Sequence, residues 1–351
     1  MERILKQICR ALMDSYQEFA RPFPWKNTRD PYKIWLSEII LQQTRTEQGL
    51  PYYNRIIQKY PDIETLANAN ESVFLKDWEG LGYYSRARNL LYTARVLRDQ
   101  YQGVFPDDYK DILALKGVGP YTAAAIASFA FGQSYPVVDG NVFRLFTRIF
   151  ALTDPIDVTS TRHKVQKIVG ATMGNADPAV FNQAIMNLGA TVCTPKNPNC
   201  NRCPVQNFCQ AYTDQLIALI PVKKKKIKKQ TLFFNYFYIP SPSQSFAMLQ
   251  RDNSSFWKQM YEFPVIEESE AFSSLTLLSN KVQQKWNLPP IKLNYLGKTT
   301  QSLSHRHIHA RLFRMPPISL DLWKAGWVEA DQQLLNQFPL PKLIRDLLIM
   351  L

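Results

Sequence analysis

The chain has 351 residues, which exceeds the size of a typical single domain, so we expect two domains. Lys and Arg number 42 against 29 Asp and Glu, and the formal net charge of +13 favours a polyanionic partner, most often nucleic acid. The longest clean apolar run, 123–131, is too short to span a bilayer, and the N-terminus lacks the apolar segment of a signal peptide. We therefore expect a cytoplasmic protein rather than a membrane or secreted one.

The first 214 residues are predicted to be mostly helical. Two helix starts are well signalled, because Asp30 can cap a helix that has Pro31 at its first position, and Gly119-Pro120 repeats this placement of proline. Apolar residues recur at helical spacing in five stretches, which are 4–19, 33–60, 84–101, 122–131 and 141–150.

The composition changes after Tyr212. Six lysines fall between positions 223 and 229, directly after Pro221, and indicate a basic linker, which we place at 215–230. Aromatic and β-branched residues then predict a strand at 231–239. Further strands are expected at 247–251 and 310–314, and helices at 270–286 and 341–351. The sequence therefore predicts a helical domain at 1–214 and an α+β domain at 231–351.

Four of the five cysteines lie within 17 residues, while Cys9 stands apart. An odd number of cysteines without an export signal does not indicate a disulfide framework. Four thiolates so close together are typical of one metal site. On this chemistry we favour a [4Fe–4S] cluster, and zinc stays the alternative. The candidate ligands, spaced C-x6-C-x2-C-x5-C, are Cys193, Cys200, Cys203 and Cys209.

The segment Leu115–Gly119 lies between two predicted helices. Gly117 and Gly119 allow a tight turn, and the helix that begins at Pro120 then points free N–H groups outward. Such a turn can bind a DNA phosphate, which positions a duplex without reading its sequence. The alternative is an ordinary turn between two helices.

Two carboxylates have contrasting predicted environments. Helical spacing surrounds Glu38 with apolar side chains, so burial is expected to raise its pKa and favour the protonated acid. Asp139 precedes Gly140-Asn141 at the start of another helix, where free amides favour the ionised form. One raised and one lowered carboxyl pKa is the pattern of glycosidic bond cleavage. A plain N-cap at Asp139 and a partly exposed helix carboxylate at Glu38 remain the alternatives.

Several motifs together resemble the MutY family of adenine DNA glycosylases. These are Trp35–Thr44 (WLSEIILQQT), Gly80–Ala87 (GLGYYSRA), Gly117–Ala123 (GVGPYTA), Val138–Val142 (VDGNV) and the cysteine spacing shared with endonuclease III relatives. The resemblance covers essentially all of residues 1–212. It implies a mainly α helix-hairpin-helix glycosylase core with a [4Fe–4S] cluster, and a nucleoid-associated monomer that acts on double-stranded DNA.

The resemblance also implies the reaction. The enzyme would flip and excise adenine mispaired with 8-oxoguanine or guanine, with Glu38 as the general acid at N7 and Asp139 stabilising the oxocarbenium ion or a covalent intermediate. Bifunctional endonuclease III-type relatives carry a lysine at the position of Tyr121, so a monofunctional glycosylase is implied here. Tyr121 and Asn141 would orient the sugar and the water. The adenine pocket would be lined by Arg21, Trp25 and Leu41, and the duplex contacted by Gln43 and Tyr83.

The second domain resembles the MutT-like, or Nudix-like, C-terminal domain of the same family through Trp257–Pro264 (WKQMYEFP). The acidic Nudix catalytic box is absent, so no pyrophosphatase activity is expected. The family's Phe-Ser-His loop, which recognises 8-oxoguanine, is matched by Leu303, Ser304 and His305, with leucine in place of phenylalanine. His307 and His309 alternate with His305, and we interpret them as part of a half-exposed strand rather than a metal site.

Three other functions compete with this interpretation. An endonuclease III-like pyrimidine glycosylase and lyase is disfavoured by Tyr121 and by the second domain. A catalytically inactive DNA-binding protein is disfavoured by the presence of both Glu38 and Asp139. An electron carrier is disfavoured by the basic charge and the hairpin.

Overall fold

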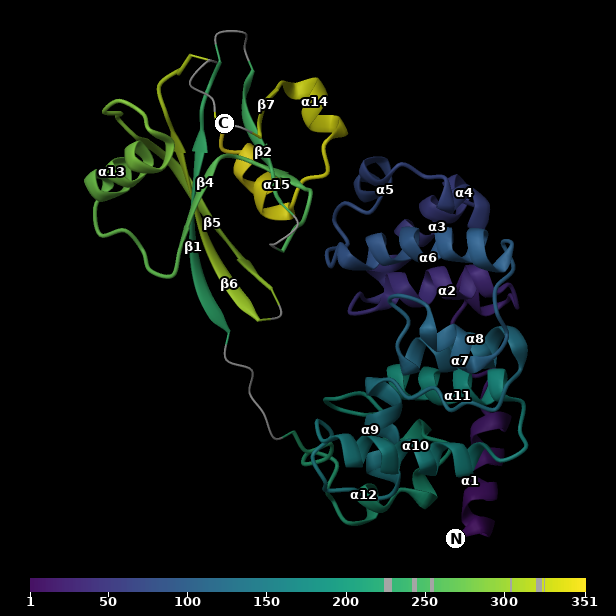
Figure 1. Cartoon of the computed structure of the whole chain (residues 1–351). Coiled ribbons are helices and arrows are strands. Elements are labelled where there is room, and N and C mark those ends of the chain that lie inside the picture. The colour runs from purple at the N-terminus through teal and green to yellow at the C-terminus, as the bar shows by residue number, and fades with distance from the viewer. Residues whose placement is uncertain (224–228, 242–244, 253–255, 304, 320–323, 325) are drawn as a thin grey trace. The chain divides into compact units, whose positions relative to one another are not determined.

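The computed structural model describes the whole chain except residues 224–228, 242–244, 253–255, 304, 320–323 and 325 (Figure 1). It divides into two compact units, Met1–Asn68 with Asn89–Lys225, and Ala69–Arg88 with Lys226–Leu351. The domain boundaries at 214 and 231 stay a prediction. In the described part of the chain, every helix is too short or too polar to cross a membrane.

The first unit is helical, and a buried core joins α1, α9, α10 and α11 within it. Its helices are α1 (Glu2–Asp14), α2 (Pro31–Leu41), α3 (Thr46–Lys59), α4 (Ile63–Ala67), α7 (Tyr109–Ala114), α8 (Pro120–Phe131), α9 (Gly140–Ile149), α10 (Thr159–Met173), α11 (Pro178–Thr191) and α12 (Gln210–Thr213). Short 3-10 turns are η1 (Pro24–Lys26), η2 (Cys200–Arg202) and η3 (Gln206–Phe208). Helix α6 (Ser85–Tyr101) begins in the second unit and continues into the first.

Helices α2 and α8 pack directly against each other. Helix α2 begins where the Asp30 carboxylate accepts the backbone N–H of Tyr32 at 3.0 Å, with Pro31 at the first helical position, as the sequence predicts. Helix α8 is rich in buried alanines, whose small side chains allow close packing of the two helices. This packing brings Glu38 on α2 and Tyr121 on α8 to one cleft.

The hairpin between α7 and α8 requires glycine at position 117. Gly117 has φ +85°, and a Cβ added there would lie 2.8 Å from the Cβ of Asn89. Gly119 has φ −98° and nothing within 4 Å of an added Cβ, so its glycine is not required by sterics. The two hairpin glycines therefore have different structural roles.

The second unit contains two sheets. The four-stranded sheet has the order β4-β1-β6-β5, in which β1 and β6 are parallel and the other neighbours antiparallel. The three-stranded antiparallel sheet has the order β3-β2-β7. The strands are β1 (Gln230–Tyr238), β2 (Phe246–Gln250), β3 (Tyr261–Glu262), β4 (Val265–Glu268), β5 (Asn294–Ser302), β6 (Arg306–Arg314) and β7 (Trp327–Ala330). The helices are α5 (Glu71–Asp77), α13 (Leu275–Trp286), α14 (Gln332–Gln337) and α15 (Lys342–Leu348).

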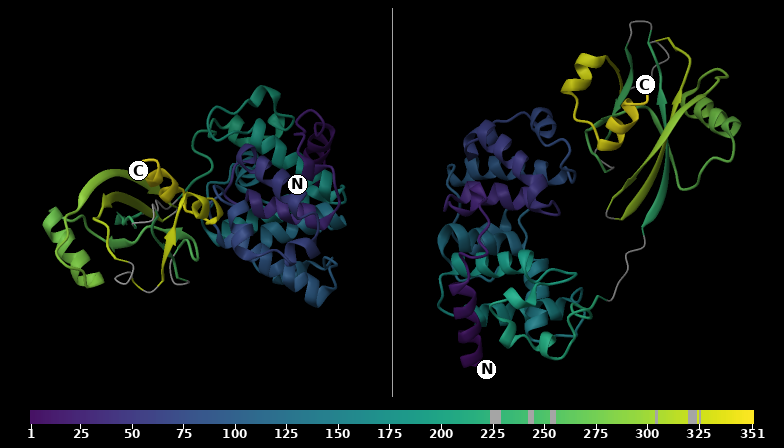
Figure 2. Two further views of the ribbon diagram at one scale, coloured as in Figure 1. Left: turned by 90° about the horizontal axis from the view of Figure 1, so that it is seen from above. Right: turned by 180° about the vertical axis from the view of Figure 1, so that it is seen from behind.

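Alternate residues of β1 face two different cores. Phe234 and Tyr236 pack with residues of β2, β6, α14 and α15, whereas Phe237, and Ile239 just after the strand, pack with α13. Helix α13 and the α14–α15 pair accordingly lie on opposite sides of the long strands (Figures 1 and 2). This arrangement confirms the predicted α+β character of the second domain.

Most predicted elements exist, but several boundaries were wrong. The helix predicted at 4–19 ends at Asp14, and that at 270–286 begins at Leu275. The stretch 33–60 is two helices, because the chain turns between Leu41 and Thr46, where Gln43 has φ +57°. That turn lines the cleft described below, so the interruption forms part of the site.

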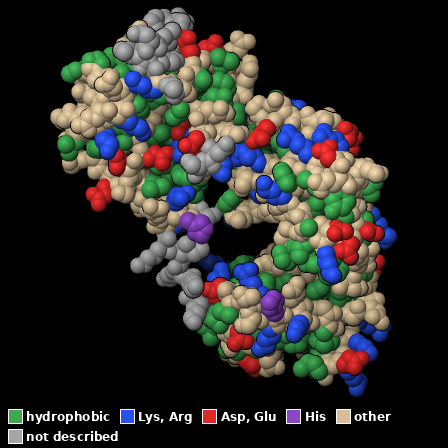
Figure 3. Space-filling view, in the orientation of Figure 1, with side chains coloured by type: hydrophobic (Ala, Val, Ile, Leu, Met, Phe, Trp, Pro, Cys, Tyr) green, Lys and Arg blue, Asp and Glu red, His purple; other side chains and the backbone are tan. Residues whose placement is uncertain are grey.

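Positive charge is spread over the face of the molecule that Figure 3 shows. On the face shown in Figure 3, Lys and Arg side chains occur on both units and are interspersed with Asp and Glu. The net charge alone therefore does not locate a binding site. A cleft in the helical unit, described below, is the candidate site.

Candidate active site

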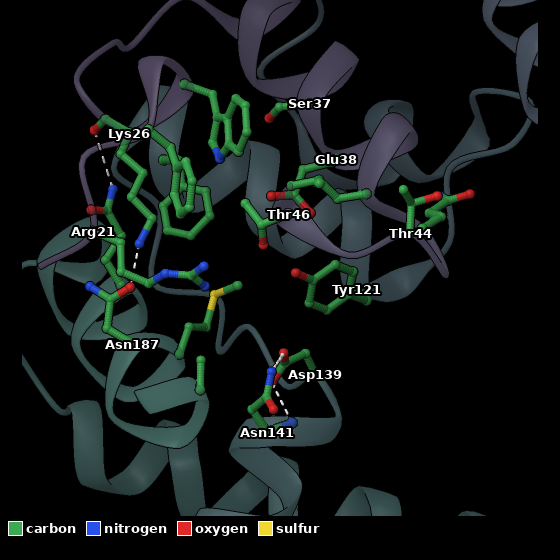
Figure 4. A pocket seen from close by; sticks show the side chains of 18 of the residues that line it. Arg21, Lys26, Ser37, Glu38, Thr44, Thr46, Tyr121, Asp139, Asn141 and Asn187 are labelled. Atoms are coloured by element: carbon green, nitrogen blue, oxygen red, sulfur yellow. Dashed lines mark hydrogen bonds between the residues drawn. The ribbon is translucent and has the colours of Figure 1, made fainter. Parts of the chain in front are cut away.

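A cleft of about 810 Å³ opens in the helical unit, within the usual size range of small-molecule sites. Residues of η1, α2, α8, α11 and the start of α9 line it (Figure 4). Eight predicted site residues are among them, and these are Arg21, Trp25, Glu38, Leu41, Gln43, Tyr121, Asp139 and Asn141.

Glu38 lies near the C-terminal end of α2 with only 7% of its surface exposed. Burial raises its pKa to about 7, and the negative charge of Asp139 acts in the same direction. Hydrogen bonding from the Tyr121 hydroxyl and the positive charge of Lys26 oppose this increase. The predicted rise in pKa is thus present, and at neutral pH a large fraction of the carboxyl is protonated.

Asp139 is the N-cap of α9. Its Oδ1 accepts the backbone N–H groups of Asn141 at 2.9 Å and Val142 at 2.7 Å, and its Oδ2 accepts the Asn141 side-chain amide at 2.7 Å. Arg144 in turn donates to Asn141 Oδ1 at 2.9 Å. Asp139 is therefore the N-cap of α9, and these hydrogen bonds fix its carboxylate at the wall of the cleft.

Tyr121 lies in the first turn of α8. In Figure 4 its ring lies between Glu38 and Asp139. Burial and the charges of these two carboxylates raise the pKa of Tyr121 well above its ordinary value. The phenol is therefore neutral and can donate a hydrogen bond to the Glu38 carboxyl.

The remaining predicted cleft residues form its walls. Trp25 is buried, stacks on Phe23 with 5.0 Å between ring centroids, and meets Tyr53 edge-on. Arg21 pairs with Glu47 at 2.8 Å. The arrangement offers a flat aromatic surface and a guanidinium, which suit a planar heterocycle.

The sequence interpretation missed Lys26 and Asn187. Lys26 in η1 donates to Asn187 Oδ1 on α11, and burial lowers the pKa of Lys26 to about 8. Both line the cleft (Figure 4). Lys26 directly follows the predicted pocket residue Trp25, and this was the only signal in the sequence that could have drawn attention to it.

The predicted duplex-contacting residues do not all lie in the cleft. Gly117 and Gly119 form the hairpin, whose Gly117 carbonyl accepts Gln42 Nε2 at 3.4 Å. Tyr83 belongs to the second compact unit, is 45% exposed, and has φ +48°. The Arg86 guanidinium lies 5.6 Å from the centroid of its ring.

Two of the predicted lesion-reading residues, Leu303 and His305, lie between β5 and β6 in the second unit. The N–H of half-buried Leu303 donates to the Arg306 carbonyl at 2.8 Å, and His305 is exposed. Ser304 lies outside the described residues. His307 Nδ1 is 2.8 Å from Ser302 Oγ, and His309 stacks on Phe233.

The four clustered cysteines line one small cavity of about 20 Å³. Its other walls include Leu145, Ile149 and Arg148, and the Arg148 guanidinium lies 3.5 Å from the Cys193 sulfur. Among the described residues, no three His, Cys, Asp or Glu side chains lie close enough together to hold one metal ion. Cys9 lies elsewhere, with its sulfur 3.8 Å from the Met173 carbonyl oxygen.

Family models and solved structures agree on the helical part. The HhH-GPD superfamily base excision DNA repair protein model matches residues 36–171, and the iron-sulfur binding domain of endonuclease III matches 193–209. A thermostable thymine-DNA glycosylase superposes with TM-score 0.56 and 30% identity over 60% of this chain and 98% of its own. A trapped endonuclease III–DNA covalent intermediate, 20% identical, shares the fold at TM-score 0.53 over 62% of this chain and 99% of its own.

The fold and the cleft thus define a helix-hairpin-helix base excision repair protein with an iron–sulfur binding segment. Adenine DNA glycosylases are similar to most of the chain. The adenine DNA glycosylase of Buchnera aphidicola (Baizongia pistaciae) is 32% identical, and the match covers 84% of this chain and 82% of that protein. The adenine DNA glycosylase of Mus musculus is 33% identical, and the match covers 84% of this chain and 67% of that protein. The chain belongs to the adenine DNA glycosylases. The family resemblance, the fold class and the adenine-specific glycosylase activity expected from the sequence are confirmed.

Proposed function

We propose that the enzyme excises adenine paired with 8-oxoguanine or guanine in double-stranded DNA, and that Glu38 is the general acid. The observation that carries this proposal is the buried Glu38 carboxyl, with a pKa near 7, in the same cleft as Asp139. An acid is most effective when its pKa lies near the working pH. Protonation of N7 by Glu38 makes the flipped adenine a better leaving group.

We propose that Asp139 stabilises the sugar as the base departs. Departure of the base leaves positive charge on the sugar ring, and a nearby carboxylate stabilises it electrostatically or by transient covalent capture of the ring carbon. The three hydrogen bonds that Asp139 accepts hold it in place without neutralising it. Asn141 and Tyr121 orient this carboxylate, the sugar and the attacking water.

The enzyme is proposed to be a monofunctional glycosylase. Tyr121 cannot form a Schiff base, and Phe143, four residues after Asp139, offers no amine either. Excision should therefore leave an intact abasic strand.

Recognition of the duplex is divided among several segments. Arg21, Trp25 and Leu41 form the walls against which the flipped adenine packs. Gln43 and Tyr83, both at positive φ, insert near the opposing base, and the Gly117–Gly119 hairpin binds a backbone phosphate. Leu303, Ser304 and His305 read the 8-oxoguanine, and the enzyme acts as a monomer.

The cysteine site fits a [4Fe–4S] cluster, which we propose these four thiolates hold. Such a cluster takes one cysteine at each of its four irons. Support comes from the cavity that all four cysteines line and from the match of residues 193–209 to the iron-sulfur binding domain of endonuclease III. Bound there, the cluster would cross-link four positions within residues 193–209.

A single-turnover excision assay on A:8-oxoguanine, A:G and A:T duplexes tests the function. We expect rapid release of adenine from the first two and little from A:T. Glu38→Gln keeps the shape of the side chain but delivers no proton, so excision should fall by at least about 10²–10⁴-fold while duplex binding persists. The wild-type rate should also decline as the pH rises above about 7.

Glu64→Gln is the matched control, because Glu64 is an exposed-helix carboxylate on α4 outside the cleft. It should excise adenine at the wild-type rate. A Glu38→Gln enzyme as fast as wild type would remove Glu38 from the mechanism, and release of pyrimidines with strand cleavage would favour the endonuclease III-like alternative.

A further inference from the structure

A second hollow of about 340 Å³ adjoins the cleft. Val138, Asp139 and Arg162 line both spaces, so Asp139 stands at their shared wall. Asp157 and Lys223 also line the hollow. A ligand group that contacts Asp139 from the cleft therefore lies next to the hollow.

Two cations of this hollow are available to bind a ligand. Arg162, in the first turn of α10, uses Nε to donate to the Ile156 carbonyl at 3.3 Å. Among the described residues, neither its terminal guanidinium nitrogens nor the exposed Lys223 ammonium has a hydrogen-bond or ion-pair partner. The N–H of Ile156 donates to Val222 O at 3.0 Å, which fixes the segment before Lys223 next to the same loop.

The nearby helix terminus supplies only part of what an anion needs here. The Asn141 and Val142 amides in the first turn of α9 already donate to Asp139. The charged donors that line the hollow are the side chains of Arg162 and Lys223. Arg and Lys are the side chains that most often contact DNA phosphates.

The chemistry of a nucleotide connects the two spaces. Its base and both of its phosphates are attached to the same sugar. If the adenine reaches toward Glu38 and its sugar lies at Asp139, a phosphate leaves the cleft beside Asp139, and the hollow with Arg162 and Lys223 begins there.

We propose that Arg162 and Lys223 bind the backbone phosphate attached to the sugar from which adenine is excised. This inference rests on the proposed function, in which Asp139 faces that sugar. Asp157 lines the same hollow, and its negative charge opposes phosphate binding. Removal of the cations and removal of Asp157 should therefore have opposite effects.

The test combines variants with duplexes that carry a neutral methylphosphonate 5′ or 3′ of the target adenine. Single-turnover rates at increasing enzyme concentration give a half-saturating concentration and a maximal rate. For wild type, one of the two modifications should raise the half-saturating concentration by about threefold to tenfold. Arg162→Gln should raise it by a similar factor on the unmodified duplex, and the modification should then add nothing further.

Two additional measurements sharpen this test. Arg162→Gln and Lys223→Gln should each reduce the slope of log affinity against log salt by about 1, and Asp157→Asn should lower the half-saturating concentration. Lys164→Gln is the matched control, because Lys164 lies on the same helix but pairs with Asp154 outside the hollow. It should respond to both methylphosphonates as wild type does.

The proposal is overturned if Arg162→Gln remains as sensitive to methylphosphonate as wild type, or if it behaves like Lys164→Gln. It is equally overturned if Asp157→Asn weakens binding. Adenine excision by the wild type on the unmodified duplex is read in the same experiment. Failure of the proposed function and failure of this inference are therefore distinguishable.

Discussion

Glu38 and Lys26 share one cleft, and burial drives both side chains toward their neutral forms. A buried ionisable group of this kind costs folding free energy at any pH where it is charged. Burial of Glu38 therefore lowers the free energy of unfolding, but it also gives a carboxyl with a pKa near 7 that can hold a proton at neutral pH. The loss of stability can be measured separately from catalysis.

Glu38→Gln should raise the free energy of unfolding at pH 8 by about 1–3 kcal/mol, and by much less at pH 5. The pKa of Glu38 is about 7 in the folded protein against 4.5 as its ordinary value. The folded state therefore holds the proton more tightly, and this stabilisation is complete below pH 4.5 and is lost as the pH rises through about 7. Glutamine undergoes no such loss.

Urea unfolding of the wild type and of Glu38→Gln at pH 5 and pH 8 gives the two free energies of unfolding, with Glu64→Gln as the control. The difference in free energy of unfolding between the control and the wild type should be the same at the two pH values. An advantage of Glu38→Gln that is the same at pH 5 and pH 8 would contradict a raised pKa for Glu38.

The sequence could predict the environment of Glu38 but not that of Lys26. Glu38 lies within its own apolar helix, so its burial follows from the spacing of its immediate neighbours. Burial of Lys26 depends on Asn187, which is 161 positions away on α11. Contacts between distant segments leave no periodic signal in the chain.

At the scale of elements, capping residues and apolar periodicity predicted the starts of α2 and α8 well. Helices α10 and α11 were not predicted, and the turn between α2 and α3 was hidden inside an apolar pattern that runs through it. Nothing in the spacing distinguishes Gln43 at φ +57° from a helical residue. Functional turns of this kind are where local patterns and tertiary structure disagree.

Gly117→Ala should destabilise the helical unit by about 1–3 kcal/mol, whereas Gly119→Ala should change its stability little. Alanine at 117 meets both the positive φ and the Asn89 side chain at 2.8 Å, while alanine at 119 meets neither. Thermal unfolding of the two variants measures the difference. Equal losses at the two positions would show that the hairpin is not constrained at Gly117.

At the scale of the whole molecule, the proposal assigns bond cleavage to the helical unit and lesion reading to the C-terminal domain. Adenine is chemically the same in a mispair and in A:T, so discrimination must use the opposite base and the lower cost of unpairing a mismatch. The two activities should therefore be separable by substitution.

Ser304→Ala combined with His305→Ala should lower the preference for A:8-oxoguanine over A:G by about fivefold or more, since lost hydrogen bonds of this kind cost about 1–3 kcal/mol. The ratio of excision rates on the two duplexes is the measurement, and excision from A:G should survive. His163→Ala, an exposed histidine on α10, is the control. An unchanged ratio in the double variant would place lesion reading elsewhere.

Loss of the cluster should be visible in the iron content and the colour of the protein. Anaerobically purified protein should contain about four irons per chain and absorb broadly in the visible range. Cys200→Ser should lose iron and colour, whereas Cys9→Ser should keep both, because Cys9 lies outside the cysteine cavity. Stoichiometric zinc in place of iron would contradict the proposed cluster.

The N-cap geometry of Asp139 restricts how this position can evolve. Only a few short polar side chains cap a helix well, and among them aspartate alone carries a negative charge. A drift to serine or threonine would preserve α9 and lose the charge, while a drift to glutamate would keep the charge and give up the cap. Folding and catalysis thus both require aspartate at position 139, and every substitution there should impair at least one of them.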